Sequence, residues 1–338
     1  GETDTINRTL YYATKFDADP DTAGDWTEYT TQPADNATFA TAKAALLAGL
    51  NDTDATAETR GTLPLSLKMV RTTTAAATDL LLDTYTGAAA AYSVRKLDKD
   101  YTGSCMRVRE DSGDTETDIG FDSNGDLATA DIATHCGSAN GYVVTWYDQS
   151  GNSNNATQST ASLQPQIYNG TAVITANSKP AIDFPSGDQN LNGTLSLSGD
   201  QTIAAVATSD TAGIETLLSS GSGWALLRST NNAVLQTSTS GDSDNIYGSW
   251  VTGNQELHFA FRDGTTSTNS FGRKNGSEGA LNLNGTGEIT GTFYIGKLIN
   301  LNGYSWDGTI QEIVIWANQS ANKTGIESDI NTYFSIYT

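Results

Sequence analysis

The sequence predicts a mainly β protein: a two-sheet antiparallel jelly-roll sandwich with a C-terminal helix, preceded by a small α/β domain. Three observations carry this prediction. Short runs rich in Val, Ile, Tyr and Thr recur from residue 80 onward, Asn-Gly and Asp-Gly dipeptides separate many of them, and residues 324–337 have a helical period. Many short strands joined by tight turns are typical of sandwiches and jelly rolls.

Residues 1–75 form the first predicted domain, a small α/β unit for attachment or assembly. Strand composition marks residues 9–16 and 26–31, and residues 63–70 alternate between apolar and polar side chains. Residues 36–51 place their apolar side chains on one face of a helix. A domain this short buries a small share of its surface, so we expect its apolar faces to contact other subunits.

Residues 76–338 form the second predicted domain, the sandwich. The turn dipeptides between its strands tolerate the positive φ that hairpins require. In the C-terminal helix, Thr324 and Glu327 have the spacing of a capping box. The predicted strands are residues 141–147, 172–175, 181–184, 202–208, 224–228, 256–261, 292–295 and 310–316.

The charge balance excludes several classes of partner. The 338 residues contain 18 Lys and Arg against 39 Asp and Glu, which gives a formal net charge of −21. Such an acidic protein repels phosphates, so we expect neither nucleic acid nor an anionic membrane as a partner. No apolar run approaches the roughly 18 residues of a membrane-spanning helix, and the chain opens without a basic, apolar signal segment.

The chain has two cysteines, Cys105 and Cys136, and two histidines, His135 and His258. This set lacks the paired spacing of a structural zinc site. Two cysteines in an acidic, Lys-poor chain are compatible with one extracellular disulfide and equally with two buried thiols. His135 and Cys136 do not form a catalytic pair, because adjacent side chains on a strand point to opposite faces.

Motifs for catalysis and cofactors are missing from the sequence. It has no Gly-x-Ser-x-Gly elbow and no phosphate-binding Walker loop. Asp122 begins a stretch that resembles a calcium loop, but position six is Leu127 and position twelve is Ala133, so a plain turn is the better interpretation. We expect no catalytic residues, no metal site and no cofactor, with calcium in the acidic sandwich loops as the alternative.

Four segments carry a family resemblance: Leu-Asp-Thr-Tyr at 82–85, Ala-Ala-Tyr-Ser-Val-Arg-Lys-Leu at 90–97, Thr-Trp-Tyr-Asp-Gln-Ser-Gly-Asn at 145–152, and Gly-Thr-Ile-Gln-Glu-Ile-Val-Ile-Trp at 308–316. The first three resemble the opening of the catalytic β-sandwich of family 54 α-L-arabinofuranosidases. They resemble more closely the concanavalin A-like (laminin-G-like) modules of tailed-bacteriophage virion proteins, and the fourth segment resembles the closing strand of the same phage modules. The resemblance spans roughly residues 80–337 and implies a concanavalin A-like sandwich.

The resemblance also implies where catalytic groups would stand. The arabinofuranosidases have a nucleophilic Glu on one strand and an acidic Asp after another, and alignment by strand order places these at Ala225 and Leu298. A shifted register would offer Glu215 as the nucleophile, with the acid still missing. Since retaining glycosidases need two carboxylates, the resemblance predicts a protein that is not an enzyme.

The function that follows is a non-enzymatic phage virion structural protein: an appendage, fibre or capsid-decorating subunit. It would lie on the virion surface as a homo-oligomer, contact other virion subunits through residues 1–75, and bind host-surface glycans with the sandwich. The alternatives are a secreted glycoside hydrolase related to arabinofuranosidases, and a bacterial surface adhesin or filament subunit. Because the resemblance places Cys105 and Cys136 in one module that faces an oxidising exterior, it favours a disulfide between them.

Sugar-binding sandwiches stack an aromatic ring on the sugar and bind its hydroxyls with polar side chains. Aromatic and polar residues near turn-rich segments are therefore the candidates. Each has a structural alternative, a core position for the rings and an Asx-turn for the carboxylate. The candidates are Trp146, Asp148, Asn152, Tyr247, Trp250, Tyr304 and Trp306.

Overall fold

A computed structural model describes residues 6–13, 27–28, 66–73, 79–185, 187–221, 224–237, 245–266, 269–280, 288–298 and 304–338. The chain divides into two compact units, Gly1–Thr78 and Asp79–Thr338. In the first unit, β1 (Ile6–Ala13) pairs antiparallel with β2 (Thr27–Glu28) and with β3 (Ser66–Thr73). These strands overlap the three predicted ones, whereas the predicted helix at 36–51 lies outside the described residues.

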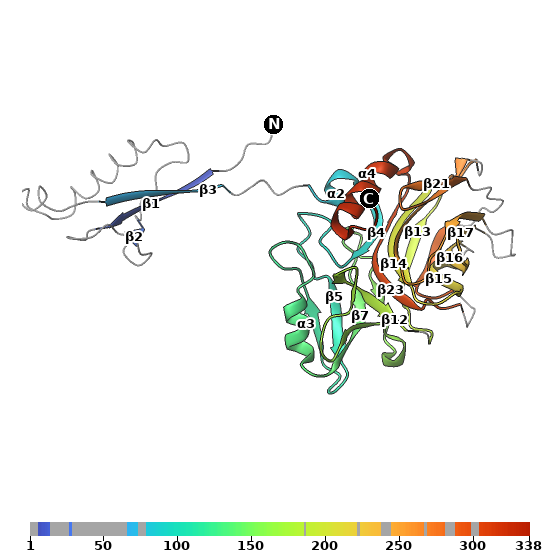
Figure 1. The fold of residues 1–338 in the computed structure, drawn as a ribbon, viewed down its shortest axis with the longest axis horizontal. Helices are drawn as coiled ribbons and strands as arrows, with labels where there is room; N and C mark the ends of the chain where they lie inside the picture. The colour runs from blue at the N-terminus through green and yellow to red at the C-terminus, as the bar shows by residue number, and fades with distance from the viewer. Residues whose placement is uncertain are drawn as a thin grey trace, which may run out of the picture. The chain divides into compact units, whose positions relative to one another are not determined.

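The second unit is a sandwich of antiparallel sheets, as predicted (Figure 1). The first sheet comprises β4 (Ala88–Ser93), β12 (Ile182–Phe184), β14 (Gln201–Ser209), β19 (Gln255–Arg262), β20 (Phe271–Lys274), β21 (Ser277–Ala280) and β23 (Gly308–Trp316). The second comprises β5 (Met106–Glu110), β6 (Glu116–Ile119), β7 (Asn140–Trp146), β8 (Ala156–Thr157), β13 (Leu191–Leu197), β15 (Gly213–Ser220), β16 (Trp224–Thr230), β17 (Asn232–Thr237), β18 (Asn245–Ser249) and β22 (Ile289–Ile295). β9 (Gln166–Asn169) pairs with β7 and with β12, so it connects the two sheets.

Smaller elements flank the sheets. β10 (Thr175–Ala176) and β11 (Lys179–Pro180) form a two-stranded ribbon. The helices are α2 (Leu81–Thr84), α3 (Thr129–Cys136) and α4 (Lys323–Phe334), with 3-10 turns at Ala161–Leu163 and Ser320–Asn322. None of the helices among the described residues has the length and apolar character needed to cross a bilayer.

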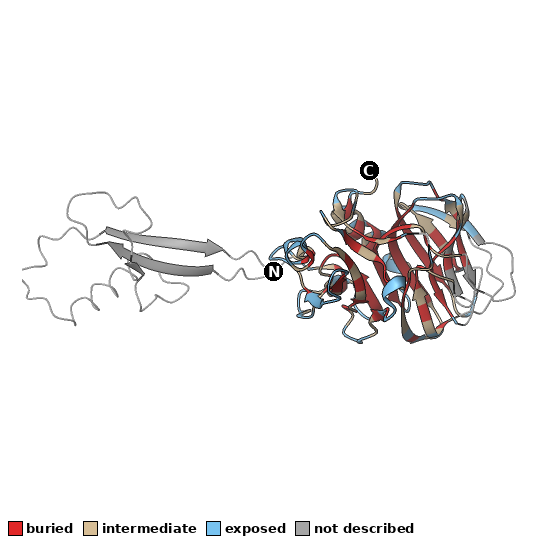
Figure 2. Cartoon of the chain, turned by 90° about the horizontal axis from the view of Figure 1, so that it is seen from below, coloured by how far each residue is buried: buried red, intermediate tan, exposed pale blue. Residues whose placement is uncertain are grey.

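The core lies between the sheets, whose strands are largely buried (Figure 2). β14 and β23 are buried along their whole length. Their pairing places Ile203 beside Ile315. From β4, the ring of Tyr92 lies 5.8 Å from that of Trp146 and 6.1 Å from that of Phe293, measured between centroids. Each large apolar side chain buried in this way stabilises the fold by about 1.5–3 kcal/mol.

The C-terminal helix is present, but its predicted capping box is wrong. α4 begins at Lys323, with Asn322 as its N-cap residue. The carboxylate of Glu327 instead accepts a hydrogen bond from Arg273 Nε at 2.7 Å, so α4 is joined to β20. Ile326 on the same helix is fully buried. The Glu side chain therefore holds α4 against the sheet and does not close its first turn.

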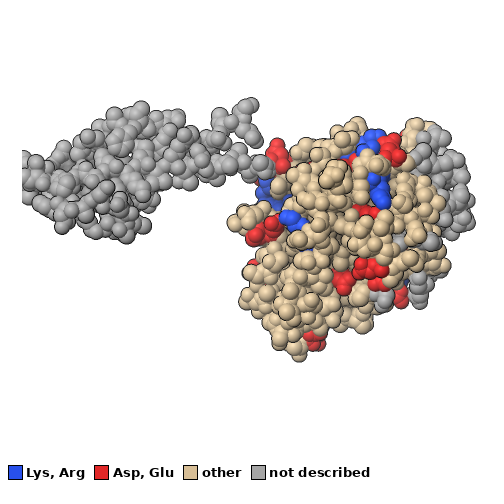
Figure 3. All heavy atoms as spheres, in the orientation of Figure 1, with Lys and Arg blue, Asp and Glu red and all other residues tan. Residues whose placement is uncertain are grey.

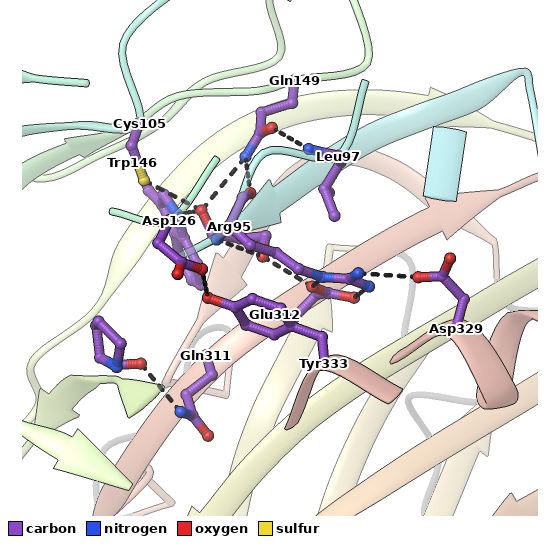
Figure 4. A network of polar contacts seen from close by, with 12 residues as sticks. Arg95, Leu97, Cys105, Asp126, Trp146, Gln149, Gln311, Glu312, Asp329 and Tyr333 are labelled. Carbon is purple, nitrogen blue, oxygen red and sulfur yellow. Dashed lines mark hydrogen bonds and ion pairs between the residues drawn. The ribbon is translucent and has the colours of Figure 1, made fainter. Parts of the chain in front are cut away.

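A buried ion network joins α4 to β23 and to the segment after β4 (Figure 4). The guanidinium of Arg95 binds both oxygens of Glu312, at 2.8 and 3.1 Å, and a third nitrogen donates to Asp329 on α4 at 2.9 Å. The side chains of Arg95 and Glu312 are 8% and 0% exposed. The ring of Tyr333 covers the guanidinium, and its hydroxyl donates to Asp126. Every charge in this network has a partner, as burial requires.

The two thiols are free and buried, so the predicted disulfide is wrong. Cys105 Sγ donates to the carbonyl of Ser93 at 3.1 Å. Cys136 ends α3, and His135 lies beside it on this helix, not on a strand as expected. Burial raises the pKa of both thiols, that of Cys136 to about 11.

We expect two free thiols in the protein under non-reducing conditions. Titration with a thiol reagent after denaturation should give two equivalents, and a reductant should leave the thermal midpoint unchanged. Alkylation of the native protein should be slow, because the thiolate is the reactive form and both pKa values are raised. A chain that yields thiols only after reduction would contradict the structure.

Candidate functional site

A pocket of about 870 Å³ lies over part of the first sheet. β12, β14, β19 and β23 supply its floor, and the turn at residues 251–254 and the C-terminal residues 335–336 supply parts of its wall. Its lining is mostly polar: it contains carboxyl, amide and hydroxyl side chains, and none of the residues that line it is aromatic.

The strand register builds the floor of the pocket. Asp183 on β12 pairs with Thr309 on β23, Thr309 pairs with Thr208 on β14, and Thr208 pairs with Gln255 on β19. Residues directly opposite one another in antiparallel strands point to the same face, with Cβ atoms about 4.5–5.5 Å apart. These four side chains therefore form one polar row across the sheet.

Thr208 and Thr309 are the unusual members of this row. Each is only 9% exposed, and the Oγ1 of each has no hydrogen-bond partner in the structure. A buried hydroxyl without a partner costs about 1–3 kcal/mol. The two hydroxyls lie side by side beneath the pocket surface, and each gains a hydrogen bond if its side chain turns towards a polar ligand.

Three carboxyl groups gather at one end of the row. Gly308 has φ +138°, and a Cβ there would lie 2.2 Å from the carbonyl oxygen of Thr208, so only Gly permits β14 and β23 to approach this closely. Just beyond, Asp210 N donates to Asp307 O at 2.8 Å. Asp183 stands on the neighbouring strand. Figure 3 shows acidic and basic side chains in small patches on a face that is mostly uncharged.

The carboxyl groups alter one another's acidity. Burial, together with the charges of Asp210 and Asp307, raises the pKa of Asp183 to about 6. Burial and Asp307 also raise the pKa of Asp210. A carboxyl with a pKa near 6 holds a proton at mildly acidic pH and can give it to a leaving group.

Glu256 forms a charged part of the pocket wall. Its Oε1 accepts from Lys274 Nζ at 2.9 Å and from Val251 N at 3.2 Å, and its Oε2 lies 3.3 Å from His258 Nε2. Burial would raise the pKa of Glu256, but the contacts with His258 and Lys274 outweigh it and hold the pKa below its ordinary value. Glu256 is thus an ionised carboxylate with its partners inside the protein.

Four of the predicted glycan-binding rings lie in the core, which corrects that prediction for them. Trp146, Trp250, Trp306 and Tyr247 are at most 5% exposed, and Trp250 stacks on the ring of His258 at 3.8 Å. A ring packed on both faces by protein has no face left for a sugar.

The other three candidates lie outside the lining of the pocket. Tyr304 is half-buried and Asn152 is exposed. Asp148 is buried and fixes a turn, because its carboxylate accepts from the backbone N of Ser150 at 2.9 Å and of Asn154 at 2.9 Å. These contacts confirm the Asx-turn interpretation of Asp148.

The next residue of the same motif, Gln149, is also structural. Its Oε1 accepts from Leu97 N at 2.8 Å, and its Nε2 donates to the carbonyls of Ser93 and Arg95. The motif that carried the family resemblance therefore holds the segment after β4 in place.

The positions aligned with the arabinofuranosidase carboxylates lie in the second sheet. Ala225 on β16 pairs with Ser219 on β15, and Leu298 follows β22, which pairs with β15. Neither position offers a carboxylate. Glu215 is buried and accepts from the hydroxyls of Ser209 and Thr211, so it already has partners inside the sandwich.

In the described part of the chain, one group of side chains has the spacing of potential metal ligands. Oxygen atoms of Asp83, Asp98 and Asp100 lie within 4.8 Å of one another. Hydrogen bonds explain this arrangement, because Asp83 binds Lys99 Nζ at 3.1 Å and Leu80 N at 2.8 Å. In the predicted turn, Asp122 accepts from two backbone N–H groups, as expected.

Sequence reasoning missed the acidic pocket. One signal in the sequence could have indicated it: Asp183 places a carboxylate between Ile182 and Phe184, inside the otherwise apolar predicted strand 181–184. The pairing of β12 and β14 with β23 could not be inferred from spacing, since β23 lies far from both in the sequence.

Comparisons with known proteins point to the catalytic sandwich of family 54 arabinofuranosidases. A family model described as "Alpha-L-arabinofuranosidase B, catalytic" matches residues 78–191. The structure resembles a family 54 α-L-arabinofuranosidase soaked with a cyclic sulfate inhibitor, with 16% identity and a TM-score of 0.52. It also resembles an arabinofuranosidase complexed with arabinofuranosyl-α-1,2-xylobiose, with 17% identity and a TM-score of 0.50.

Each alignment covers 74% of this chain and 64% of the other chain, and at these identities the likeness establishes a shared fold. No match was found among curated proteins. The prediction of a non-enzymatic phage virion protein is wrong: the matches favour a glycoside hydrolase, and none of them shows a phage module. That prediction depended on the closer resemblance to phage modules and on the lack of a carboxylate at Ala225 and Leu298, whereas the structure places a group of carboxyl side chains in the other sheet.

Proposed function

We propose that the sandwich of residues 79–338 is a glycoside hydrolase whose active carboxyl groups lie in the acidic pocket. The observation that carries this proposal is the grouping of Asp183, Asp210 and Asp307 beside a floor of unpaired hydroxyls. Glycoside hydrolysis uses two carboxyl groups, one that protonates the leaving oxygen and one that acts as base or nucleophile.

Asp183 fits the role of general acid. Its pKa of about 6 keeps a proton on it under conditions where an ordinary Asp is fully ionised. Asp210 is exposed at the end of β14 and can meet a water or a substrate. It is the candidate base or nucleophile, with Asp307 as the neighbour that raises the pKa of both.

The comparisons support the substrate class to test first. The family match at residues 78–191 includes Asp183, and two of the similar structures were determined with arabinofuranosides. We therefore expect the purified full chain to release 4-nitrophenol from 4-nitrophenyl α-L-arabinofuranoside, or reducing sugar from neutral arabinose-containing polysaccharides, above the buffer rate. Buffer-level rates with all these substrates would refute the proposal.

The pH dependence of hydrolysis should reflect the titration of the Asp183 carboxyl group. A general acid acts in its protonated form, so kcat/KM should fall as the pH rises through about 6. Initial rates measured from pH 4 to pH 9 at constant ionic strength test this. A rate that rises through the same range would assign the essential proton to a different group.

A further inference from the structure

We infer that Thr208 and Thr309 bind neighbouring hydroxyls of a neutral sugar ring, and so determine which glycans the pocket accepts. This inference rests on the proposed function for the class of ligand. Its own support comes from the two threonines, which are more than nine-tenths buried, line the pocket and have unpaired Oγ1 atoms.

The two hydroxyls stand on adjacent strands. Because Thr208 and Thr309 are a direct cross-strand pair, their Cβ atoms are about 4.5–5.5 Å apart and both side chains rise from one face. Both Oγ1 atoms are closed to solvent in this structure, so a sugar ring lying over the pair contacts them once each side chain turns about its Cα–Cβ bond and brings its Oγ1 to the pocket surface. A hydroxyl of a sugar both donates and accepts, as a Thr hydroxyl does, so each contact satisfies a buried group that otherwise has no partner.

The charges of the pocket favour a neutral ligand. Its charged lining residues are Asp183, Asp210, Glu256 and Lys274. Lys274 Nζ donates to Glu256 at 2.9 Å and to the carbonyl of Ser249 at 2.5 Å, so the cation is already engaged. A uronic acid would bring its carboxylate towards Asp183 and Asp210 without an available cation to bind it.

The floor around the threonines is held in place by amides. Asn177 Nδ2 donates to Gln255 Oε1 at 3.0 Å, and Gln255 donates to Gln311. Gln311 in turn donates to the carbonyl of Pro180 at 3.0 Å. The polar row is therefore preorganised on rigid strands, which lowers the cost of ordering it around a ligand.

The test uses the full chain, three probe sugars and three isosteric variants. L-arabinose, D-galactose and D-galacturonate share a ring hydroxyl pattern and differ at C5, where galacturonate carries a carboxylate. Thr208→Val and Thr309→Val each remove one unpaired hydroxyl. Thr202→Val is the matched control on β14, because Thr202 Oγ1 donates to Ala317 O at 3.1 Å and accepts from Gln319 N at 2.9 Å.

Titrations followed by calorimetry or NMR should show that Thr208→Val and Thr309→Val each weaken binding of the neutral sugars by about 2- to 10-fold, the effect of one lost hydrogen bond. Their thermal midpoints should be unchanged or higher, since an unsatisfied buried group is removed. Thr202→Val should show the reverse, a lower midpoint with unchanged affinity. Galacturonate should bind more weakly than galactose.

Unchanged affinity in both pocket variants, tighter binding of galacturonate than of galactose, or no binding of any probe to the wild-type chain would each overturn the inference. Binding needs no turnover, so the two proposals fail separately. A chain that binds neutral sugars through the threonines without hydrolysing glycosides would refute the proposed function alone. A hydrolase whose Thr variants keep affinity and KM would refute the inference alone.

Discussion

Replacement of Asp183 by Asn should lower kcat for glycoside hydrolysis by about 10²- to 10⁴-fold, the usual contribution of a positioned general acid. Asn has the shape of Asp but no proton of suitable acidity. The fold should survive, because burial and the nearby carboxyl groups disfavour the ionised form of Asp183. At pH 7 an Asp in the unfolded chain is ionised, and folding has to bury that charge or protonate it. Asn carries no charge, so the variant avoids this cost, and its thermal stability at pH 7 should be unchanged or higher.

The matched control is Asp100→Asn, which changes an exposed carboxylate outside the pocket and should leave kcat unaltered. Asp210→Asn should lower kcat as well, if Asp210 is the second carboxyl of the pair. Initial rates with 4-nitrophenyl α-L-arabinofuranoside and thermal melts of the same samples measure both effects. A folded Asp183→Asn protein with wild-type kcat would remove Asp183 from the mechanism.

Replacement of Arg95 by Met should destabilise the sandwich by about 3–5 kcal/mol, because it leaves the charge of Glu312 buried without its counter-ion. The loss should be measurable as a lower midpoint in urea unfolding. Arg107→Met is the control. Arg107 forms a comparable two-bonded pair with Asp118, but its side chain is 41% exposed, so the cost should be about 0–1 kcal/mol.

A double variant separates the charge from the shape of the network. Arg95→Met combined with Glu312→Leu removes both buried charges, and it should recover a large part of the lost stability. If the double variant is less stable than Arg95→Met alone, the loss comes from packing around Tyr333 and α4 and not from the uncompensated carboxylate.

Local pattern was enough to predict the sandwich. The strands predicted at 202–208 and 310–316 correspond to β14 and β23, since runs of β-branched residues between turn dipeptides specify strands through short-range physics. The C-terminal helix was predicted from its apolar period for the same reason. α3 was missed, because Thr129–Cys136 is short and has Ala and Ile as its apolar residues.

The acidic pocket was decided by the tertiary structure alone. Nothing in the spacing of Asp183, Thr208 and Thr309 places them together, and only the pairing of β12 and β14 with β23 does so. The sequence also did not determine whether the tryptophan rings are buried. Trp146, Trp250 and Trp306 lie near turns, where a ring can face a sugar or the core. The periodicity of a sequence predicts which residues share a face of one strand. Which strands become neighbours, and which face is covered, depends on how the two sheets pack, and that packing set the acidity of Asp183 and left two hydroxyls without partners.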